Sequence, residues 1–376
     1  MNNTAATTKQ IPFFDYPSIY KIDVQGLSEV IKDVCSRGAY ILQKDVKEFE
    51  ANLAEFTGAK YAIGVANGTD ALIIALRAAG ISNGDEVIFC THTYVATAAS
   101  IHFNGAIPIP VECGSDHMID PKAIEAAITS KTKAIMPTQL NGRTADMDEI
   151  QKIAKKYNLQ IIEDAAQALG STYKGKSAGT FGVAGTISFY PAKNLGCFGD
   201  GGAILTNDDN LYEKMYYIHD HGRDENWDIV CWGLNSRLDN LQAAILNYKL
   251  MRYRDRVKRR REIAALYNDN LCQVKELHIP PGPLSNADNF DVFQNYEIEA
   301  ENRDELKNYL QSKGIGTIIQ WGGILVHQMS KLGFDQSLPF AEKMMSKSLL
   351  LPLYPGLSDE NIHYICDMIK SFYSKG

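Results

Sequence analysis

Short apolar runs alternate with amphipathic helical patterns through the first half of the chain. After an irregular start, the spacing of apolar residues predicts a helix over 45–56 and a strand over 61–66. Further strands are predicted over 86–90, 107–112, 133–139 and 160–163, and the helices between them over 69–80, 94–103, 121–129 and 147–157. This alternation is typical of right-handed βαβ units, so we expect a mainly parallel sheet with helices on both faces.

The regular alternation ends near residue 186. Two strands, over 186–190 and 203–206, follow each other with little between them, which indicates a change of topology. One long helix is predicted over 237–271, and a smaller α+β unit follows, with strands over 292–298 and 315–320 and helices over 302–313 and 358–373. The 376 residues therefore divide into a large α/β domain, 1–250, and a smaller C-terminal α+β domain, 251–376. The first 30 residues or so could pack on the smaller domain.

Composition and charge narrow the class of protein. Acidic residues outnumber basic ones by 45 to 38, which argues against a general nucleic-acid or anionic-membrane binder. The basic stretch 252–261 carries interleaved acidic residues and is interpreted as a solvated helix face. The 7 Cys form no CxxC pair, the N-terminus shows no signal-peptide pattern, and no apolar run reaches membrane-spanning length. We therefore expect a cytoplasmic protein that acts on a small molecule.

Two segments at predicted strand ends carry groups suited to an anionic ligand. Asn67-Gly-Thr-Asp70 lies between a strand and a helix, where backbone N–H groups and the Thr69 hydroxyl can converge on a phosphate. Asp164 follows the strand over 160–163, and the carboxyl ends of parallel strands form the ligand crevice in such folds. Gln167 could reach the same crevice. Taken alone, Thr69 and Asp164 could equally be helix caps or turn residues.

The most informative segment runs from residue 186 to 202. Lys193 leaves an apolar strand and enters a glycine-rich loop, where desolvation would lower its pKa and favour the neutral amine that forms a Schiff base. Ser188 on the preceding strand could donate to a phosphate, and the glycines let the backbone approach a flat ligand, although they would also suit a plain hairpin. A phosphate site, a carboxylate and an imine-forming lysine together match the needs of pyridoxal phosphate.

Several runs of sequence resemble the DegT/DnrJ/EryC1/StrS family of sugar aminotransferases. They are NGTDAL (67–72), THTYVATAAS (91–100), ADMDEI (145–150), IIEDAAQALGS (161–171), SFYPAKNLGCFGDGGAILTND (188–208) and NSRLDNLQAAIL (235–246). The resemblance spans about residues 11 to 370. It implies an aspartate-aminotransferase-like α/β fold (pyridoxal-phosphate fold type I) and a homodimer with active sites at the subunit interface.

The resemblance also assigns roles to individual residues. It places the imine-forming lysine at Lys193, the partner of the pyridine nitrogen at Asp164, and a residue near the ring hydroxyl at Gln167. Tyr94 matches an aromatic that stacks on the cofactor ring, although it could be an ordinary core aromatic. The positions that match phosphate ligands are Gly68, Thr69, Ser188 and, from the neighbouring subunit, Asn235. Arg237 matches a residue near the substrate or the amino-donor carboxylate, and a surface cation is an equal alternative.

Lysine rather than histidine at position 193 favours transamination over the sugar dehydration of some relatives. We expect a ping-pong cycle in which glutamate donates its amine and a nucleotide-linked keto sugar accepts it, for amino-sugar and surface-polysaccharide synthesis. Departures from the family pattern leave the acceptor open. Gln320-Trp321-Gly-Gly replaces a His-Tyr-Pro run, which could suit a small phosphorylated ketone such as a triose phosphate. Arg143 and Arg223 could bind acceptor phosphates or form structural ion pairs.

Two other classes of function are less favoured. His219, His221 and Cys231 lie close in sequence, but their spacing is irregular and we predict no metal site. A nucleotide-binding or regulatory module would not need Lys193, and the segment 64–68 lacks the GxGxxG spacing of a dinucleotide site.

Overall fold

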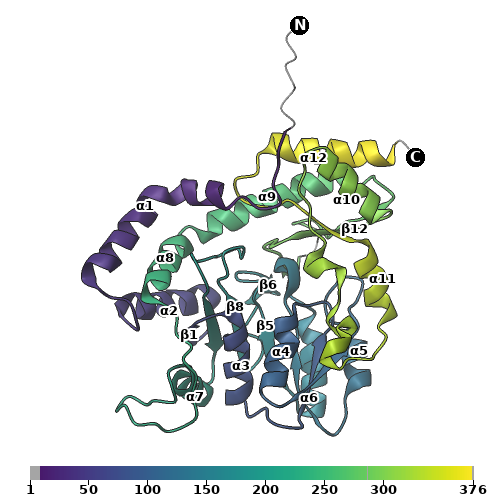
Figure 1. The fold of residues 1–376 in the computed structure, drawn as a ribbon. Helices are drawn as coiled ribbons and strands as arrows, with labels where there is room; N and C mark the ends of the chain where they lie inside the picture. The colour runs from purple at the N-terminus through teal and green to yellow at the C-terminus, as the bar shows by residue number, and fades with distance from the viewer. Residues whose placement is uncertain (1–8, 286, 375–376) are drawn as a thin grey trace.

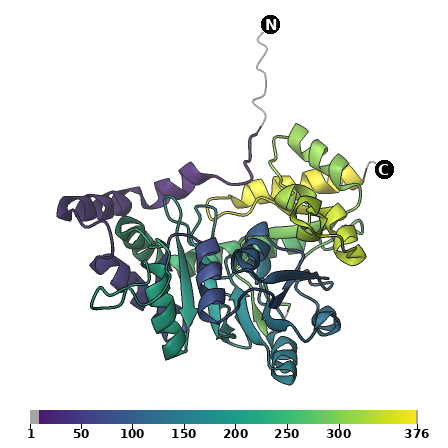
Figure 2. The ribbon, with the colours of Figure 1, turned by 60° about the horizontal axis from the view of Figure 1, so that its bottom comes forward.

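The computed structural model describes residues 9–285 and 287–374, so the beginning of the polar N-terminal stretch lies outside the described residues. A large sheet is flanked by helices in the lower part of Figure 1, and the C-terminal helices gather above it, at the end where the chain also begins. Figure 2 shows the same arrangement with the N-terminal helix reaching out to one side. In the described part of the chain, no helix has both the length and the apolar character needed to cross a membrane.

The large sheet has seven strands in the order β1-β9-β8-β5-β4-β2-β3. Their bounds are β1 Tyr61–Val65, β2 Glu86–Cys90, β3 Ile107–Val111, β4 Thr132–Met136, β5 Gln160–Asp164, β8 Ala184–Ser188 and β9 Gly202–Thr206. The pairs β2/β3, β2/β4, β4/β5 and β5/β8 are parallel, whereas β9 runs antiparallel between β8 and β1. The mainly parallel sheet and the change of topology after residue 186 are therefore confirmed.

Helices cover both faces of this sheet. They are α2 Lys44–Thr57, α3 Gly68–Ala78, α4 Val95–Phe103, α5 Pro121–Ala127, α6 Met147–Tyr157, α7 Asp209–His219 and α8 Asn240–Leu250, and α1 Tyr16–Arg37 packs against α8. Successive strand residues point to opposite faces. Ile63 and Ile204 accordingly belong to one buried cluster and Ala62 and Leu205 to another. Burial on both faces explains why these strands are continuous apolar runs.

The C-terminal part forms a second layer around its own core. Its elements are α9 Tyr253–Leu271, β10 Leu277–His278, β12 Tyr296–Ala300, α10 Arg303–Ser312, α11 Pro339–Lys347, β13 Ser348–Leu351 and α12 Asp359–Tyr373. The strand order is β10-β12-β13, and a third small sheet joins β11 Asn289–Phe290 to β6 Thr172–Tyr173 and β7 Lys176–Ser177. Ile11 lies in this C-terminal core and forms a parallel bridge with Ile315.

The predicted long helix over 237–271 is wrong, because the structure divides it into α8 and α9. Residues 237–239 are not helical, and the backbone turns at Met251 and Arg252. The break places Tyr253 in the core, where its hydroxyl donates to the carbonyl of Leu169 at 2.7 Å. No Gly or Pro marks the break, so a tertiary contact rather than local propensity determines it.

The interpretation of 252–261 as a solvated face holds for only part of the stretch, where Arg252, Arg254 and Lys258 are exposed. Arg260 is only 2% exposed and donates to the carbonyls of Phe293 and Leu353. Arg256 pairs with Asp23 of α1. These two guanidinium groups bind α9 to α1 and to the segments around Phe293 and Leu353.

Two further segments differ from the sequence-based expectation. The irregular start contains the 22-residue helix α1, whose Gly26 lies so close to Tyr248 of α8 that a Cβ there would clash with the Tyr248 side chain. The strand predicted over 315–320 is replaced by isolated bridges at Ile315 and Ile318 and a 3₁₀ turn over Gln320–Gly323. Three successive positive φ angles at residues 321–323 turn the chain directly after the predicted range.

Candidate active site

The carboxyl ends of four strands bring the predicted site residues to one edge of the large sheet. Gly68 begins α3 directly after β1, and Tyr94 precedes α4 after β2. Asp164 is the last residue of β5, and Ser188 is the last residue of β8. This edge is where open α/β sheets bind their ligands.

The Asp164 carboxylate lies buried at the centre of this edge, only 6% exposed. Its Oδ2 accepts a hydrogen bond from Thr97 Oγ1 at 2.7 Å, and its Oδ1 accepts one from the Ala166 N–H at 3.2 Å. Burial raises the pKa of Asp164, and Thr97, Ala166 and the charge of Lys193 oppose that rise. A cationic partner at this position would therefore stabilise the ionised form of the buried carboxylate.

A chain of buried hydroxyl groups supports Asp164. Thr93 Oγ1 lies 2.8 Å from Thr97 Oγ1 and 2.9 Å from Thr138 Oγ1. A hydroxyl has one proton to donate. Since Thr97 donates to Asp164, Thr93 must donate to Thr97 and Thr138 to Thr93, so the chain is oriented toward the carboxylate. Sequence reasoning missed these threonines. The available signal was Thr97, a hydroxyl residue in the first turn of α4, the helix that follows β2.

Lys193 lies in the hairpin loop between β8 and β9, whose strands pair Ser188 with Gly202. Burial lowers the pKa of the Lys193 amine, and the charge of Asp164 opposes that effect. The Gln294 side chain holds the backbone on both sides of the lysine: its Nε2 donates to the Ala192 carbonyl and its Oε1 accepts from the Asn194 N–H, both at 2.8 Å. Gln294 is about a hundred residues away in the chain, so no local pattern could have revealed it.

The adjacent carboxylate, Glu163, has a different environment. It is fully buried and accepts hydrogen bonds from Gln139 Nε2 and from the N–H groups of Gly179, Phe181 and Gly182. Successive residues of a strand point to opposite faces. Glu163 therefore fixes a loop, which leaves Asp164 as the carboxylate of the site.

The start of α3 forms a compact corner with the end of β8. Asn67 is the N-cap of α3 and accepts from the Asp70 N–H, so Thr69 lies within the first turn and does not cap the helix. Gly68 is so close to Ser188 that a Cβ at position 68 would lie 2.9 Å from the Ser188 Cβ. The helix N-terminus and Ser188 thus face the same small space, which is suited to a phosphate.

Tyr94 and Gln167 extend the site on either side of Asp164. The Tyr94 side chain is 58% exposed, which excludes the interpretation as a core aromatic. Gln167 Oε1 accepts from the Asn141 N–H at 2.9 Å. Asn141 also receives a hydrogen bond from Asn295 of the C-terminal part, so the loop after β4 and the smaller sheet meet beside Gln167.

The predicted substrate arginines all have acidic partners. Arg223 donates to both oxygens of Asp220 at 2.7 Å, and Arg237 donates to Asp220 Oδ1 at 3.0 Å. Asn235, which is exposed, pairs with Asp220 through an antiparallel bridge. Arg143 lies 3.5 Å from Asp291. These contacts favour the ion-pair alternative for Arg143 and Arg223, and Arg237, for which the alternative was a surface cation, is also ion-paired and partly buried.

The Gln320-Trp321 segment forms a tight turn beside the sheet. Gln320 is buried, and its Oε1 has no hydrogen-bond partner among the described residues. The Trp321 ring packs against the His92 ring with a centroid distance of 5.3 Å. A buried amide oxygen without a partner costs free energy unless a ligand satisfies it, which agrees with a place at the edge of a binding pocket.

These residues fit pyridoxal phosphate on three observations. Asp164 ends β5 and Lys193 follows the neighbouring strand β8, so a buried carboxylate and an amine whose pKa is lowered by burial come from adjacent strands. The corner at Gly68 and Ser188 provides a helix N-terminus and a hydroxyl for a phosphate. Tyr94 offers an exposed aromatic ring at the same edge of the sheet, where the chain leaves β2 for α4. When bound, the cofactor supplies an electron sink for the carbon that exchanges its nitrogen.

Comparison with known proteins identifies the family. The model of the DegT/DnrJ/EryC1/StrS aminotransferase family matches residues 22–370. The chain belongs to this family. It is therefore a pyridoxal-phosphate-dependent aminotransferase, as the resemblance implied.

Individual members of the DegT/DnrJ/EryC1/StrS family match nearly the whole chain. A pleiotropic regulatory protein of Geobacillus stearothermophilus is 42% identical and covers 96% of this chain and 98% of its own length. UDP-2-acetamido-2-deoxy-3-oxo-D-glucuronate aminotransferase of Pseudomonas aeruginosa is 41% identical, and the match covers 92% of this chain and 94% of that protein. The crystal structure of S. venezuelae DesV with a ketimine intermediate superposes with a TM-score of 0.93 at 36% identity, and the match covers 97% of this chain and 99% of the DesV chain. The expected aspartate-aminotransferase-like fold is thus confirmed.

Proposed function

We propose that the protein transfers an amino group from glutamate to a keto sugar linked to a nucleotide, for amino-sugar and surface-polysaccharide synthesis. The observation that carries the proposal is the placement of the buried Asp164 carboxylate at the end of β5 and of Lys193 in the loop after the neighbouring strand β8. The similarity to an aminotransferase named for a UDP-linked keto sugar supports the acceptor class. The predicted cytoplasmic location is consistent with both substrates.

The roles of the side chains follow from their positions. Asp164, stabilised in its ionised form by Thr97, would hold the pyridine nitrogen of the cofactor in its protonated state. Lys193, with its lowered pKa, would carry the covalent link to the protein and then move a proton at the reacting carbon. Asp164 is buried and Lys193 partly buried, so a charge interaction between them would be stronger than in bulk water.

The remaining cofactor contacts extend this proposal. Tyr94 would stack on the ring, a contact that contributes about 1 kcal/mol beyond burial, and Gln167 would lie near the ring hydroxyl. Gly68, Thr69 and Ser188 would bind the phosphate. We keep Arg143, Arg223, Arg237, Gln320 and Trp321 as candidate substrate contacts, and the unpartnered Gln320 Oε1 is the one with direct structural support.

We further propose that two copies form a dimer in which Asn235 of one subunit completes the phosphate site of the other. Large apolar side chains are exposed close to Asn235, including Trp227, Ile229 and Trp232, the last at 93%. Exposed apolar patches of this kind mark protein interfaces. The ion pairs of Arg223 and Arg237 with Asp220 would then shape a surface that faces the neighbouring subunit.

The decisive experiment uses the cofactor-loaded protein with glutamate and a panel of acceptors. The panel contains UDP-, dTDP- and GDP-linked keto sugars and dihydroxyacetone phosphate, and the release of 2-oxoglutarate reports turnover. Glutamate alone should bleach the yellow enzyme in a single half-reaction, and only nucleotide-linked ketones should restore the colour. Lys193→Ala is the matched control and should do neither. Turnover with the triose phosphate alone would assign the protein to a different acceptor class.

A further inference from the structure

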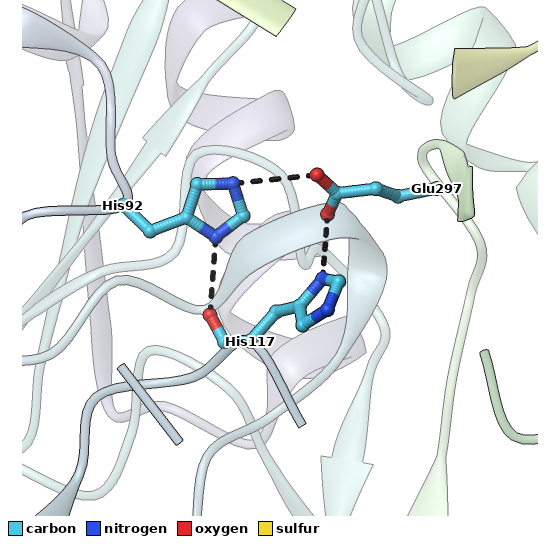
Figure 3. Close-up of side chains that lie close together, drawn as sticks. All are labelled: His92, His117 and Glu297. Carbon is cyan, nitrogen blue, oxygen red and sulfur yellow. Dashed lines mark hydrogen bonds and ion pairs between the residues drawn. The ribbon is translucent and has the colours of Figure 1, made fainter. Parts of the chain in front are cut away.

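A cluster of three buried side chains lies outside the cofactor site. Figure 3 shows His92, His117 and Glu297 pointing toward one another from three separate segments. His92 follows β2, His117 lies in the loop after β3, and Glu297 is on β12 of the C-terminal sheet. His92 is 0% exposed and Glu297 4% exposed. One ligand atom from each residue lies within 4.8 Å of the others.

The inner ring nitrogens of both histidines face the Glu297 carboxylate. His92 Nε2 lies 3.4 Å from Glu297 Oε1, and His117 Nδ1 lies 3.1 Å from Glu297 Oε2. The outer nitrogens are held by acceptors: His92 Nδ1 lies 3.3 Å from the His117 carbonyl oxygen, and His117 Nε2 lies 3.1 Å from Glu299 Oε1. A histidine that binds a metal typically donates its other N–H to a carbonyl or a carboxylate in this way.

The Glu297 carboxylate is supported from outside the cluster. Ser348 Oγ donates to its Oε1 at 2.5 Å, and Asn141 Nδ2 donates to its Oε2 at 2.6 Å. By contrast, His92 Nε2 is buried without a hydrogen bond among the described residues. If His92 Nδ1 donates to the carbonyl of His117, a neutral His92 directs the lone pair of Nε2 at a carboxylate. A cation between them would remove that repulsion.

We propose that His92, His117 and Glu297 bind one divalent transition-metal ion of the zinc class. The two contacts, of 3.4 and 3.1 Å, run to different oxygens of Glu297, and the three ligand atoms lie within 4.8 Å of one another, so small side-chain rotations would bring them to the roughly 3.3 Å separation of two ligands on a tetrahedral ion with bonds of about 2.0–2.1 Å. Two imidazoles and one carboxylate leave a fourth position, and a cavity lined by His117, Asn141, Arg143 and Glu297 adjoins it. On binding, the ion replaces any proton on His117 Nδ1, and that proton passes to solvent.

The ion would connect the two parts of the chain. Its two histidines come from loops of the large sheet and its carboxylate from the C-terminal sheet. The Trp321 ring rests on His92, so fixing the His92 ring also fixes one wall of the Gln320-Trp321 turn. The role is therefore structural and positional, and it does not depend on the proposed acceptor.

The test uses the full-length, cofactor-loaded protein after dialysis against a chelator. Titration with Zn²⁺ by calorimetry should give one site, and saturation should raise the melting temperature. Co²⁺ should give the visible absorption of a tetrahedral ion, and X-ray absorption of the zinc form should show nitrogen and oxygen ligands only. Glu297→Gln, which keeps the shape of the side chain, should weaken Zn²⁺ binding by more than about 100-fold, and Glu299→Gln by about 10- to 100-fold.

The exposed His102 provides the matched control, because it lies outside the cluster. His102→Gln should bind Zn²⁺ as the wild type does. Absence of a stoichiometric Zn²⁺ site, equal affinity in wild type and Glu297→Gln, or sulfur ligands in the absorption spectrum would each overturn the proposal. If Glu297→Gln does not fold, His92→Gln and Glu299→Gln decide the question. The measurements need no substrate, so their outcome is separate from that of the acceptor panel.

Discussion

The hydrogen bond from Thr97 to Asp164 provides a direct test of how the site holds its cofactor. Thr97→Val keeps the shape of the side chain and removes the hydroxyl that lies 2.7 Å from Asp164 Oδ2. The Ala166 N–H remains as a donor to the carboxylate. Thr93 loses Thr97 as the acceptor of its proton but keeps Thr138 within hydrogen-bond distance, so its hydroxyl can turn to donate there.

The expected effect falls on cofactor affinity. Burial raises the pKa of Asp164 in the free protein, and Thr97 is among the groups that oppose this rise. Pairing with a pyridinium nitrogen requires Asp164 to be ionised. Loss of the Thr97 donor therefore destabilises the cofactor-bound protein more than the cofactor-free protein. A hydrogen bond to a charged group contributes about 1.5–3 kcal/mol, which corresponds to a cofactor dissociation constant about 10- to 100-fold higher.

The assay is a titration of the cofactor-free protein with pyridoxal phosphate, followed by absorbance, together with thermal unfolding of the cofactor-free protein. Thr97→Ser retains the hydroxyl and should bind the cofactor with nearly wild-type affinity. The reasoning is refuted if Thr97→Val binds within about twofold of wild type, since 1.4 kcal/mol should give tenfold. Equal weakening in Thr97→Ser and Thr97→Val would also refute it, because packing rather than the proton would then be responsible.

Three further predictions concern other parts of the chain. Burial raises the pKa of Glu50 from 4.5 to about 7, so the folded state binds more protons than the unfolded state, and the free energy of unfolding falls as pH rises through that window. In denaturant unfolding above pH 7, Glu50→Gln should be more stable than the wild type by up to about 3 kcal/mol. A difference that does not change with pH would contradict this. Gln294→Leu removes two hydrogen bonds beside Lys193 and should slow the half-reaction with glutamate about tenfold at unchanged glutamate affinity, measured in single turnovers; an unchanged rate would show that the lysine needs no such support. Mixing Lys193→Ala with Asn235→Ala should restore about a quarter of wild-type activity if the dimer shares its sites, and no recovery would show that each site is built from one chain.

Local sequence patterns were sufficient to predict the sheet edge and the groups that it carries. Gly68, Asp164 and Ser188 lie at strand ends, as the alternation of apolar runs and helical patterns indicated, because strand ends are visible in a window of a few residues. The lowered pKa of Lys193 was predicted from its place after a buried strand. The break at Met251 was missed because a buried tertiary contact of Tyr253, and not a Gly or Pro, accompanies it.

The remaining features depend on contacts between distant parts of the chain. Thr97 and Asp164 are 67 residues apart, and His117 and Glu297 are 180 residues apart. No spacing rule connects such pairs, since only the tertiary fold brings them together. The histidines considered for a metal, His219 and His221, were adjacent in sequence, whereas the cluster in the structure joins two sheets.

The hairpin that carries Lys193 determines how its amine can move. Sheet pairing fixes both stems of the hairpin, and Gln294 holds the backbone on either side of the lysine. Displacement of the nitrogen must then come from rotation about the bonds of its flexible four-carbon stem. Rotamer changes are orders of magnitude faster than loop or domain motions. Repositioning of this amine should consequently be fast compared with any motion of the loop that carries it.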